Sequence, residues 1–113
     1  MCIRDRTNAN LTNANLNNAN LDSADLTDAI LSGSDLFEAN LTGANLTGAD
    51  LTFALLTEAN LSNANLSNAF LVQAFLGDTD LISANLSGAD LNNVYLGGSS
   101  PVSYTHLTLP TKA

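Results

Sequence analysis

The amino-acid sequence predicts an all-β protein, a parallel β-helix in which short coils stack into a solenoid. Three observations predict this fold. Leucine occupies every fifth position from Leu11 to Leu96, eighteen times without a gap. A small residue stands two positions before each leucine, alanine in fifteen cases and Ser34, Thr79 or Val94 in the others. The positions between are mostly Asn, Asp, Ser, Thr and Gly, which favour turns.

A period of five fits neither an α-helix nor a flat β-strand. On a helix, five residues advance by about 500°, so successive leucines would scatter around the axis and form no apolar stripe. On a strand, an odd spacing would send successive leucines to opposite faces. The remaining arrangement is a chain that turns by a fixed angle every five residues. Leucine and the small residue then point inward, and each coil hydrogen bonds to the next.

The repeated unit, Ala-(Asn/Asp)-Leu-(Ser/Thr)-X, resembles the motif of the pentapeptide-repeat family and extends from Thr7 to Gly98. The resemblance implies the fold of that family, a right-handed quadrilateral β-helix with four pentapeptides, or twenty residues, in each coil. Residues 7–98 would then form about four and a half coils. Because the second inward position is almost always alanine, we expect a narrow, filled interior with no ligand cavity.

The two ends differ from the repeat in composition, so the sequence predicts three segments: 1–6, 7–98 and 99–113. The first contains Cys2, the only cysteine, and the last contains both prolines and the only histidine, His106. Both strings resemble translated sequencing-adapter sequence. We therefore expect residues 1–6 and 99–113 to be artefactual or disordered tails, and the alternative is that they are native caps.

The distribution of charge argues against several classes of function. The formal net charge is −8, and residues 7–98 hold ten of the eleven acids and no Lys, Arg or His. Because nucleic-acid binding needs cations that displace counterions from phosphate, direct binding to DNA or RNA is not expected. The longest apolar runs have about four residues, as at 53–56, so no membrane span is expected. The start of the chain lacks the apolar run of a signal peptide, which favours a cytoplasmic location.

No catalytic, cofactor or metal site is predicted. The repeat lacks Cys, His and Lys, so no nucleophile and base can be paired except from Ser, Thr and carboxylates. Asp78 and Asp80 begin an Asp-X-Asp run, but Ala89 stands where a calcium-binding EF-hand loop needs a bidentate Glu. The sequence therefore predicts a protein that is not an enzyme.

Two exterior features are candidate interaction sites. When the sequence is folded at a period of twenty, eight of nine large apolar residues at outward positions fall on two adjacent faces, and Ile82 is the exception. The candidate interaction patch on these faces comprises Ile30, Phe53, Leu55, Phe70, Phe75 and Tyr95. A candidate acidic column comprises Glu38, Glu58 and Asp78, which are twenty residues apart. The patch fits a protein partner or self-association, or a contact with another segment of a longer protein. The column fits a cation site, a negative docking strip or a solvated edge.

Three functions are compatible with these features. The first is a non-enzymatic interaction or scaffold module that presents a rigid acidic rod. The second follows from the resemblance, because some pentapeptide-repeat proteins mimic B-DNA and bind DNA gyrase, which protects it from quinolones. Ten acidic residues without any basic residue approach the charge density of a DNA duplex of similar length, although the acidic residues are spread over all faces of the coil. The third is ice binding through a stacked column of hydroxyl side chains: Thr27, Thr47, Ser67 and Ser87.

Overall fold

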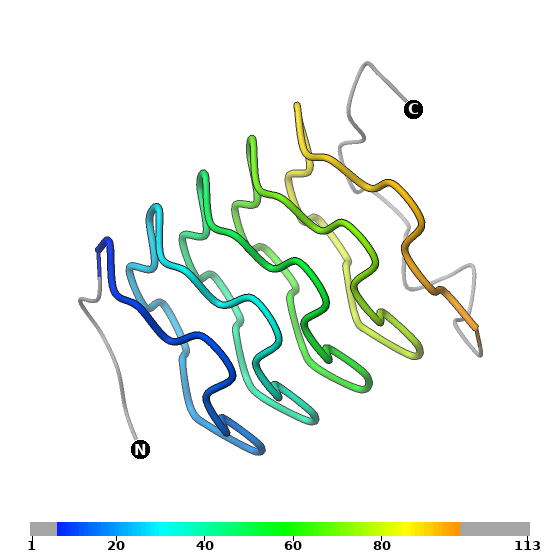
Figure 1. Cartoon of the computed structure of the whole chain (residues 1–113), viewed down its shortest axis with the longest axis horizontal. Helices are drawn as coiled ribbons and strands as arrows, with labels where there is room; N and C mark the ends of the chain where they lie inside the picture. Colours follow the sequence, from blue (N-terminus) through cyan, green and yellow to red (C-terminus); the bar gives the residue numbers. More distant parts are fainter. Residues whose placement is uncertain (1–6, 98–113) are drawn as a thin grey trace.

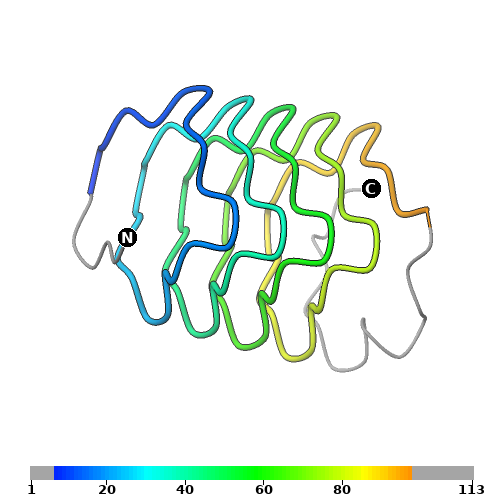
Figure 2. The same ribbon diagram turned by 90° about the horizontal axis from the view of Figure 1, so that it is seen from below.

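The computed structural model describes residues 7–97, which form a stack of similar coils (Figures 1 and 2). Within this range the backbone forms neither a helix nor a strand longer than one residue. The β-structure consists of isolated parallel bridges, and every bridge joins two residues that are twenty positions apart. The coil therefore has twenty residues, or four pentapeptides, as the resemblance to the pentapeptide-repeat family implies. The predicted tails at 1–6 and 99–113 lie outside the described residues.

The bridges form four columns that run along the stack, one for each side of the coil. Column A contains Asn10, Ile30, Asp50, Phe70 and Asp90. Column B contains Asn15, Asp35, Leu55, Phe75 and Tyr95. Column C contains Asn20, Asn40, Asn60 and Asp80. Column D contains Asp25, Asn45, Asn65 and Asn85. All bridging residues come directly before a leucine of the repeat, so each column carries the Asn/Asp position of the motif.

Backbone hydrogen bonds connect each coil to the coils on both sides. The Ile30 amide donates to the Ala9 carbonyl at 2.7 Å, and the Ile30 carbonyl accepts from the Leu11 amide at 2.7 Å. The Asn13 amide donates to the Ser32 carbonyl at 3.0 Å. The same three bonds recur along the rod, so the inter-coil backbone pairing of a sheet is achieved without extended strands.

A tight turn forms every corner of the coil. The Ala14 amide donates to the Leu11 carbonyl at 3.0 Å, and the third residue of this turn, Asn13, has a φ of 58°. Every fifth residue from Asn8 to Asn93, eighteen in all, has a positive φ at this turn position, as a type II turn requires. Asn, Asp and Gly adopt this left-handed conformation at the lowest cost, which explains why they are common there. At Gly48 a side chain would also collide with the Asp28 carboxylate of the preceding coil.

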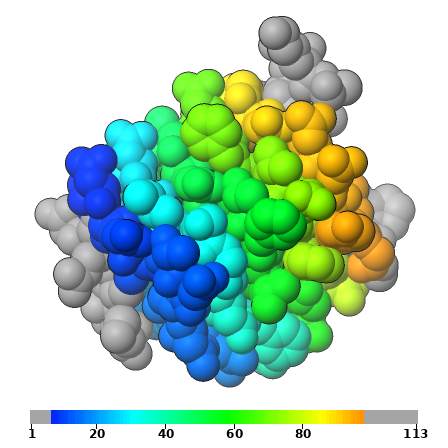
Figure 3. All heavy atoms as spheres, viewed as in Figure 1, coloured from blue at the N-terminus to red at the C-terminus, as the bar shows by residue number. Residues whose placement is uncertain are grey.

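Leucine and the small residue of each repeat form the core, as the sequence predicts. The leucines at the repeat position from Leu16 to Leu86 are buried, and so are the alanines between Ala19 and Ala89. The space-filling view shows neighbouring coils packed against each other on the face that it presents (Figure 3). The leucines near the ends of the stack are less covered: Leu11 and Leu91 are half-buried, and Leu96 is 47% exposed. Leu96 is the last leucine of the repeat, so no further repeat coil stacks on it.

Asn and Asp side chains that come directly before a repeat leucine stabilise the corners. The side chain of Asn10 accepts a hydrogen bond from the Thr12 amide at 3.1 Å, and its Oδ1 also accepts from the Thr12 hydroxyl at 2.7 Å. All thirteen Asn and Asp residues in columns A to D accept the amide bond in the same way. This Asx turn is the local reason for Asn or Asp at that position.

Two of the inward small residues are polar, and they have different surroundings. The Thr79 hydroxyl donates to the Leu56 carbonyl at 2.7 Å in the core. The Ser34 side chain is also fully buried, but its hydroxyl oxygen has no hydrogen-bond partner. Thr79 therefore stabilises the stack, whereas Ser34 keeps an unsatisfied polar group in the interior.

This difference predicts opposite effects for the same substitution. Ser34→Ala is expected to raise the free energy of unfolding by about 1 kcal/mol or more, because it removes an unsatisfied buried hydroxyl. Thr79→Ala is expected to lower it by about 1 kcal/mol through the lost hydrogen bond. Urea denaturation followed by circular dichroism measures both, and effects of the same sign would contradict the assignment.

Candidate interaction surface

The apolar surface arises where the Asx turn is lost. Five bridging positions carry a large apolar side chain that cannot accept the turn hydrogen bond: Ile30, Leu55, Phe70, Phe75 and Tyr95. These side chains are between 37% and 50% exposed. All five lie in columns A and B, on two adjacent sides of the coil, and columns C and D contain only Asn and Asp. The surface is therefore built at the expense of a bond that the fold uses elsewhere.

Column B is continuous over three coils. Leu55 bridges to Phe75, and Phe75 bridges to Tyr95. The Phe75 and Tyr95 rings stack with their centroids 4.6 Å apart and an angle of 10° between their planes. Adjacent coils are about 4.8 Å apart, so the three side chains form an apolar strip roughly 10 Å long. The apolar surface is thus continuous along this part of column B.

Column A is interrupted by carboxylates. Ile30, Asp50, Phe70 and Asp90 follow one another along the stack, so apolar and acidic residues alternate. Phe70 lies between two aspartates, and Asp50 separates it from Ile30. The candidate patch therefore divides into a continuous apolar part in column B and an alternating part in column A.

Phe53 lies at the corner between columns A and B, since it follows Asp50 and precedes Leu55 in the same coil. Its φ is 60°, and its side chain is 52% exposed. A bulky residue in this conformation is strained, and the exposed ring recovers little of the cost by packing. Strained residues that folding does not require often belong to functional surfaces.

We expect Phe53→Asn to stabilise the protein. Asn is the usual residue at this turn position and tolerates a positive φ, so the free energy of unfolding is expected to rise by about 1 kcal/mol. The reverse change at an equivalent corner, Asn63→Phe, places a phenylalanine at a φ of 61° and is expected to cost a similar amount. Urea denaturation midpoints of both variants check this prediction, which fails if Phe53→Asn is destabilising.

Three other outward apolar residues lie beside or outside the patch. Phe37 and Val72 are half-buried, whereas the six residues of the candidate patch are exposed. Ile82 is 40% exposed and belongs to neither of the two faces, as predicted. Ile82 therefore serves as a control for exposed apolar surface elsewhere on the rod.

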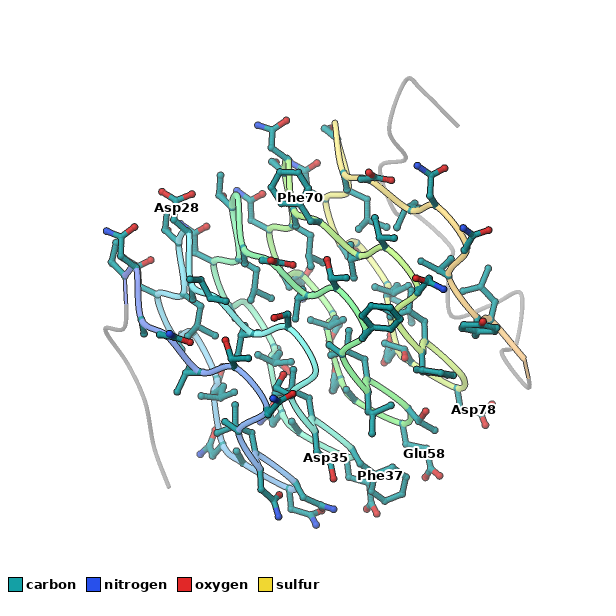
Figure 4. The ribbon with its side chains drawn as sticks, in the orientation of Figure 1. Asp28, Asp35, Phe37, Glu58, Phe70 and Asp78 are labelled. Atoms are coloured by element: carbon teal, nitrogen blue, oxygen red, sulfur yellow. The ribbon has the colours of Figure 1, made fainter. Side chains whose placement is uncertain are left out.

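The candidate acidic column lies at the corner after column B. Glu38, Glu58 and Asp78 are exposed, with φ values of 57°, 60° and 54°. Figure 4 shows Glu58 and Asp78 along one edge of the molecule and Phe70 toward the opposite edge. Each acid comes three residues after a column B residue and two residues before a column C residue, as Glu58 does between Leu55 and Asn60. The acidic column therefore borders column B but not column A.

One carboxylate has a shifted pKa. Hydrogen bonds from the Thr27 hydroxyl and the Thr27 amide to Asp25 lower the pKa of that carboxyl group. Its ionised form is thus favoured by folding, so Asp25 stabilises the protein at neutral pH and this contribution is lost as the pH falls through the lowered pKa. Two other hydroxyls of the column considered for ice binding are hydrogen bonded within the chain in the same way. The Thr47 hydroxyl donates to Asn45, and the Ser67 hydroxyl donates to Asn65.

Residues 7–97 include no group of three or more potential metal-ligating side chains. A search of the same residues finds no helix long and apolar enough to cross a bilayer.

The sequence matches the family model for pentapeptide repeats at residues 7–43, 34–71 and 59–98. These matches together cover the whole repeat region, residues 7–98. The chain belongs to the pentapeptide repeat family. No curated protein sequence matches it, and the matching family model indicates no enzyme family.

Solved structures of other pentapeptide repeat proteins are similar to this one. A protein of the Arabidopsis thaliana thylakoid lumen is 36% identical, with a TM-score of 0.80 over 82% of this chain and 65% of its own. Rfr23 of the cyanobacterium Cyanothece 51142 is 37% identical, with a TM-score of 0.63 over 93% of this chain and 63% of its own. The chain thus spans slightly less than two thirds of the length of either protein. The quinolone-resistance protein QnrB1 is 25% identical, but its TM-score of 0.37 supports no inference.

Proposed function

We propose that this pentapeptide repeat protein is a non-enzymatic interaction module. Its rigid acidic rod of about four and a half right-handed coils presents the apolar surface of columns A and B to a protein partner. Self-association is the simplest form of this interaction. The proposed module binds neither nucleic acid nor a membrane. Its proposed location is the cytoplasm, as expected from the sequence.

One observation carries the proposal. The five apolar residues of columns A and B replace Asn or Asp where thirteen equivalent positions form an Asx turn. Each replacement gives up a hydrogen bond worth about 0.5–1.5 kcal/mol and leaves an apolar side chain in water. A folding requirement does not explain this pattern, because columns C and D fold without it. Aromatic residues that cluster on an exposed surface are typical anchors of protein interfaces.

Sedimentation velocity over a concentration series tests self-association. Phe75→Asn combined with Tyr95→Asn removes the stacked rings and restores the Asx acceptors, so the fold should be kept. We expect the parent to associate with rising concentration and the double variant to remain monomeric. Ile82→Thr removes an exposed apolar side chain outside the surface and should behave like the parent. A parent that stays monomeric at all concentrations rules out self-association through column B and leaves a different protein as the partner.

A second candidate function is mimicry of DNA toward a topoisomerase such as DNA gyrase. It is favoured by the ten acidic residues in residues 7–98 and by the absence of Lys, Arg and His there. A mimic competes with duplex DNA for a basic groove, so inhibition of gyrase supercoiling should weaken as the salt concentration rises. Absence of inhibition at micromolar protein and low salt would exclude this function for the chain.

A further inference from the structure

The alternation in column A suggests the chemistry of the partner. Phe70 bridges to Asp50 on one side and to Asp90 on the other, so an exposed ring lies directly between two carboxylates. The spacing of the coils places the two aspartates roughly 10 Å apart along the column. The Phe70 side chain is 50% exposed, which leaves much of its surface open to a ligand.

The two carboxylates are held in place by the turns of their own coils. Oδ1 of Asp50 accepts from the Thr52 amide at 3.0 Å, and Oδ1 of Asp90 accepts from the Asn92 amide at 3.1 Å. These bonds use one oxygen of each carboxylate and leave the other for a donor from outside. Neither aspartate has a basic neighbour in the described part of the chain, because residues 7–97 contain no Lys, Arg or His.

We infer that column A binds a basic polypeptide segment, with an arginine side chain stacked on Phe70 and its guanidinium group bonded to Asp50 or Asp90. The inference rests on the proposed interaction function and specifies the class of partner. Arginine fits better than lysine because its guanidinium group is planar, stacks on aromatic rings and donates two parallel hydrogen bonds to a carboxylate.

Charge also separates this partner from a second copy of the chain. Two copies that met through column A would bring two pairs of uncompensated aspartates together, and like charges at an interface oppose association. A basic segment instead neutralises them. The aromatic contact further distinguishes this site from mimicry of DNA, which needs the density of charge but not the ring.

Peptides of ten arginines and ten lysines are suitable probes, because they have equal charge and differ in the group that contacts the ring. Their affinities for the full chain are measured by fluorescence anisotropy of labelled peptide at several salt concentrations. We expect the arginine peptide to bind more tightly than the lysine peptide. Phe70→Asn keeps the net charge and restores the Asx acceptor. It should lower the affinity for the arginine peptide about twofold to fivefold, so that the arginine peptide no longer binds more tightly than the lysine peptide.

Two charge-matched double variants test the carboxylates. Asp50→Asn with Asp90→Asn keeps both turns and removes two charges beside Phe70. Asp25→Asn with Asp80→Asn also keeps both turns and removes two charges, but in columns D and C. The first double variant should lower the affinity for the arginine peptide several-fold more than the second double variant does.

Three outcomes would overturn the inference. The first is an equal loss of affinity for the arginine peptide in the two double variants. The second is an unchanged affinity of Phe70→Asn for that peptide. The third is self-association of the chain that disappears in Phe70→Asn while binding of the arginine peptide is retained. The proposed function has a separate readout in the Phe75 and Tyr95 variants. An association lost only in those variants would therefore support an interaction module whose partner is not basic at column A.

Discussion

Replacing Leu56 with aspartate is expected to unfold much of the rod. Leu56 is fully buried, and its carbonyl accepts hydrogen bonds from the Thr79 hydroxyl and the Ala59 amide. A carboxylate there would lie in an apolar interior without a cation, which is far more costly than a lost contact. Leu56→Ala removes most of the side chain and leaves a cavity, so it is expected to lower the free energy of unfolding by about 2–5 kcal/mol.

The adjacent residue provides the control. Thr57 lies one step outward and is half-buried, so Thr57→Ala is expected to change the stability by less than about 0.5 kcal/mol. Circular dichroism during urea denaturation measures all three variants. Similar midpoints for Leu56→Ala and Thr57→Ala would show that the inward direction of the leucines is wrong.

Enlarging an interior alanine should have the next largest effect. Ala44 is fully buried, and it follows Ala24 and precedes Ala64 along the same line of the stack, both also buried. Ala44→Leu adds three carbon atoms to a close-packed interior and is expected to cost about 1–3 kcal/mol or more through displaced neighbours. The cost should appear as a lower denaturation midpoint.

The same change near the end of the stack should cost less. Ala14 is only half-buried and packs at the edge of the core, so Ala14→Leu has room to place its side chain. A comparable loss of stability in both variants would mean that the interior at Ala44 is not filled. It would also contradict the expectation that the rod contains no ligand cavity.

The fold could be predicted from the sequence because the same five-residue pattern specifies the inward residues and the turn residues in every repeat. Leucine every five residues fixes the inward direction. Asn or Asp before it, which the sequence analysis treated only as a residue that favours turns, supplies the Asx turn. The four-sided coil was implied by the family resemblance and not by the period, and the bridges between residues such as Leu55 and Phe75 now show it. The absence of continuous strands was not predicted, since sheet-like hydrogen bonding normally accompanies them.

The surface was predicted less completely. Residue types and a period of twenty placed Phe70 and Phe75 on adjacent faces, which is correct, but a list of apolar residues does not reveal what lies between them. Asp50 and Asp90 were counted with the acids, and their position around Phe70 follows only from column A. The strain at Phe53 could have been suspected from its place in the turn, where most repeats have Asn, Asp or Gly, yet its φ had to be observed.

The twenty-residue bridges also have a consequence for the kinetics of folding. The inter-coil hydrogen bonds join residues that are nineteen to twenty-one positions apart, as between Leu11 and Ile30 or Ala9 and Ile30, wherever they lie in the rod. Loop closure for each new coil therefore has the same entropic cost, and this cost does not grow with the number of coils. The slow event should be formation of the first pair of stacked coils, after which further coils add one at a time. A longer rod of the same repeat would then nucleate no more slowly than this one, since it offers more places to begin.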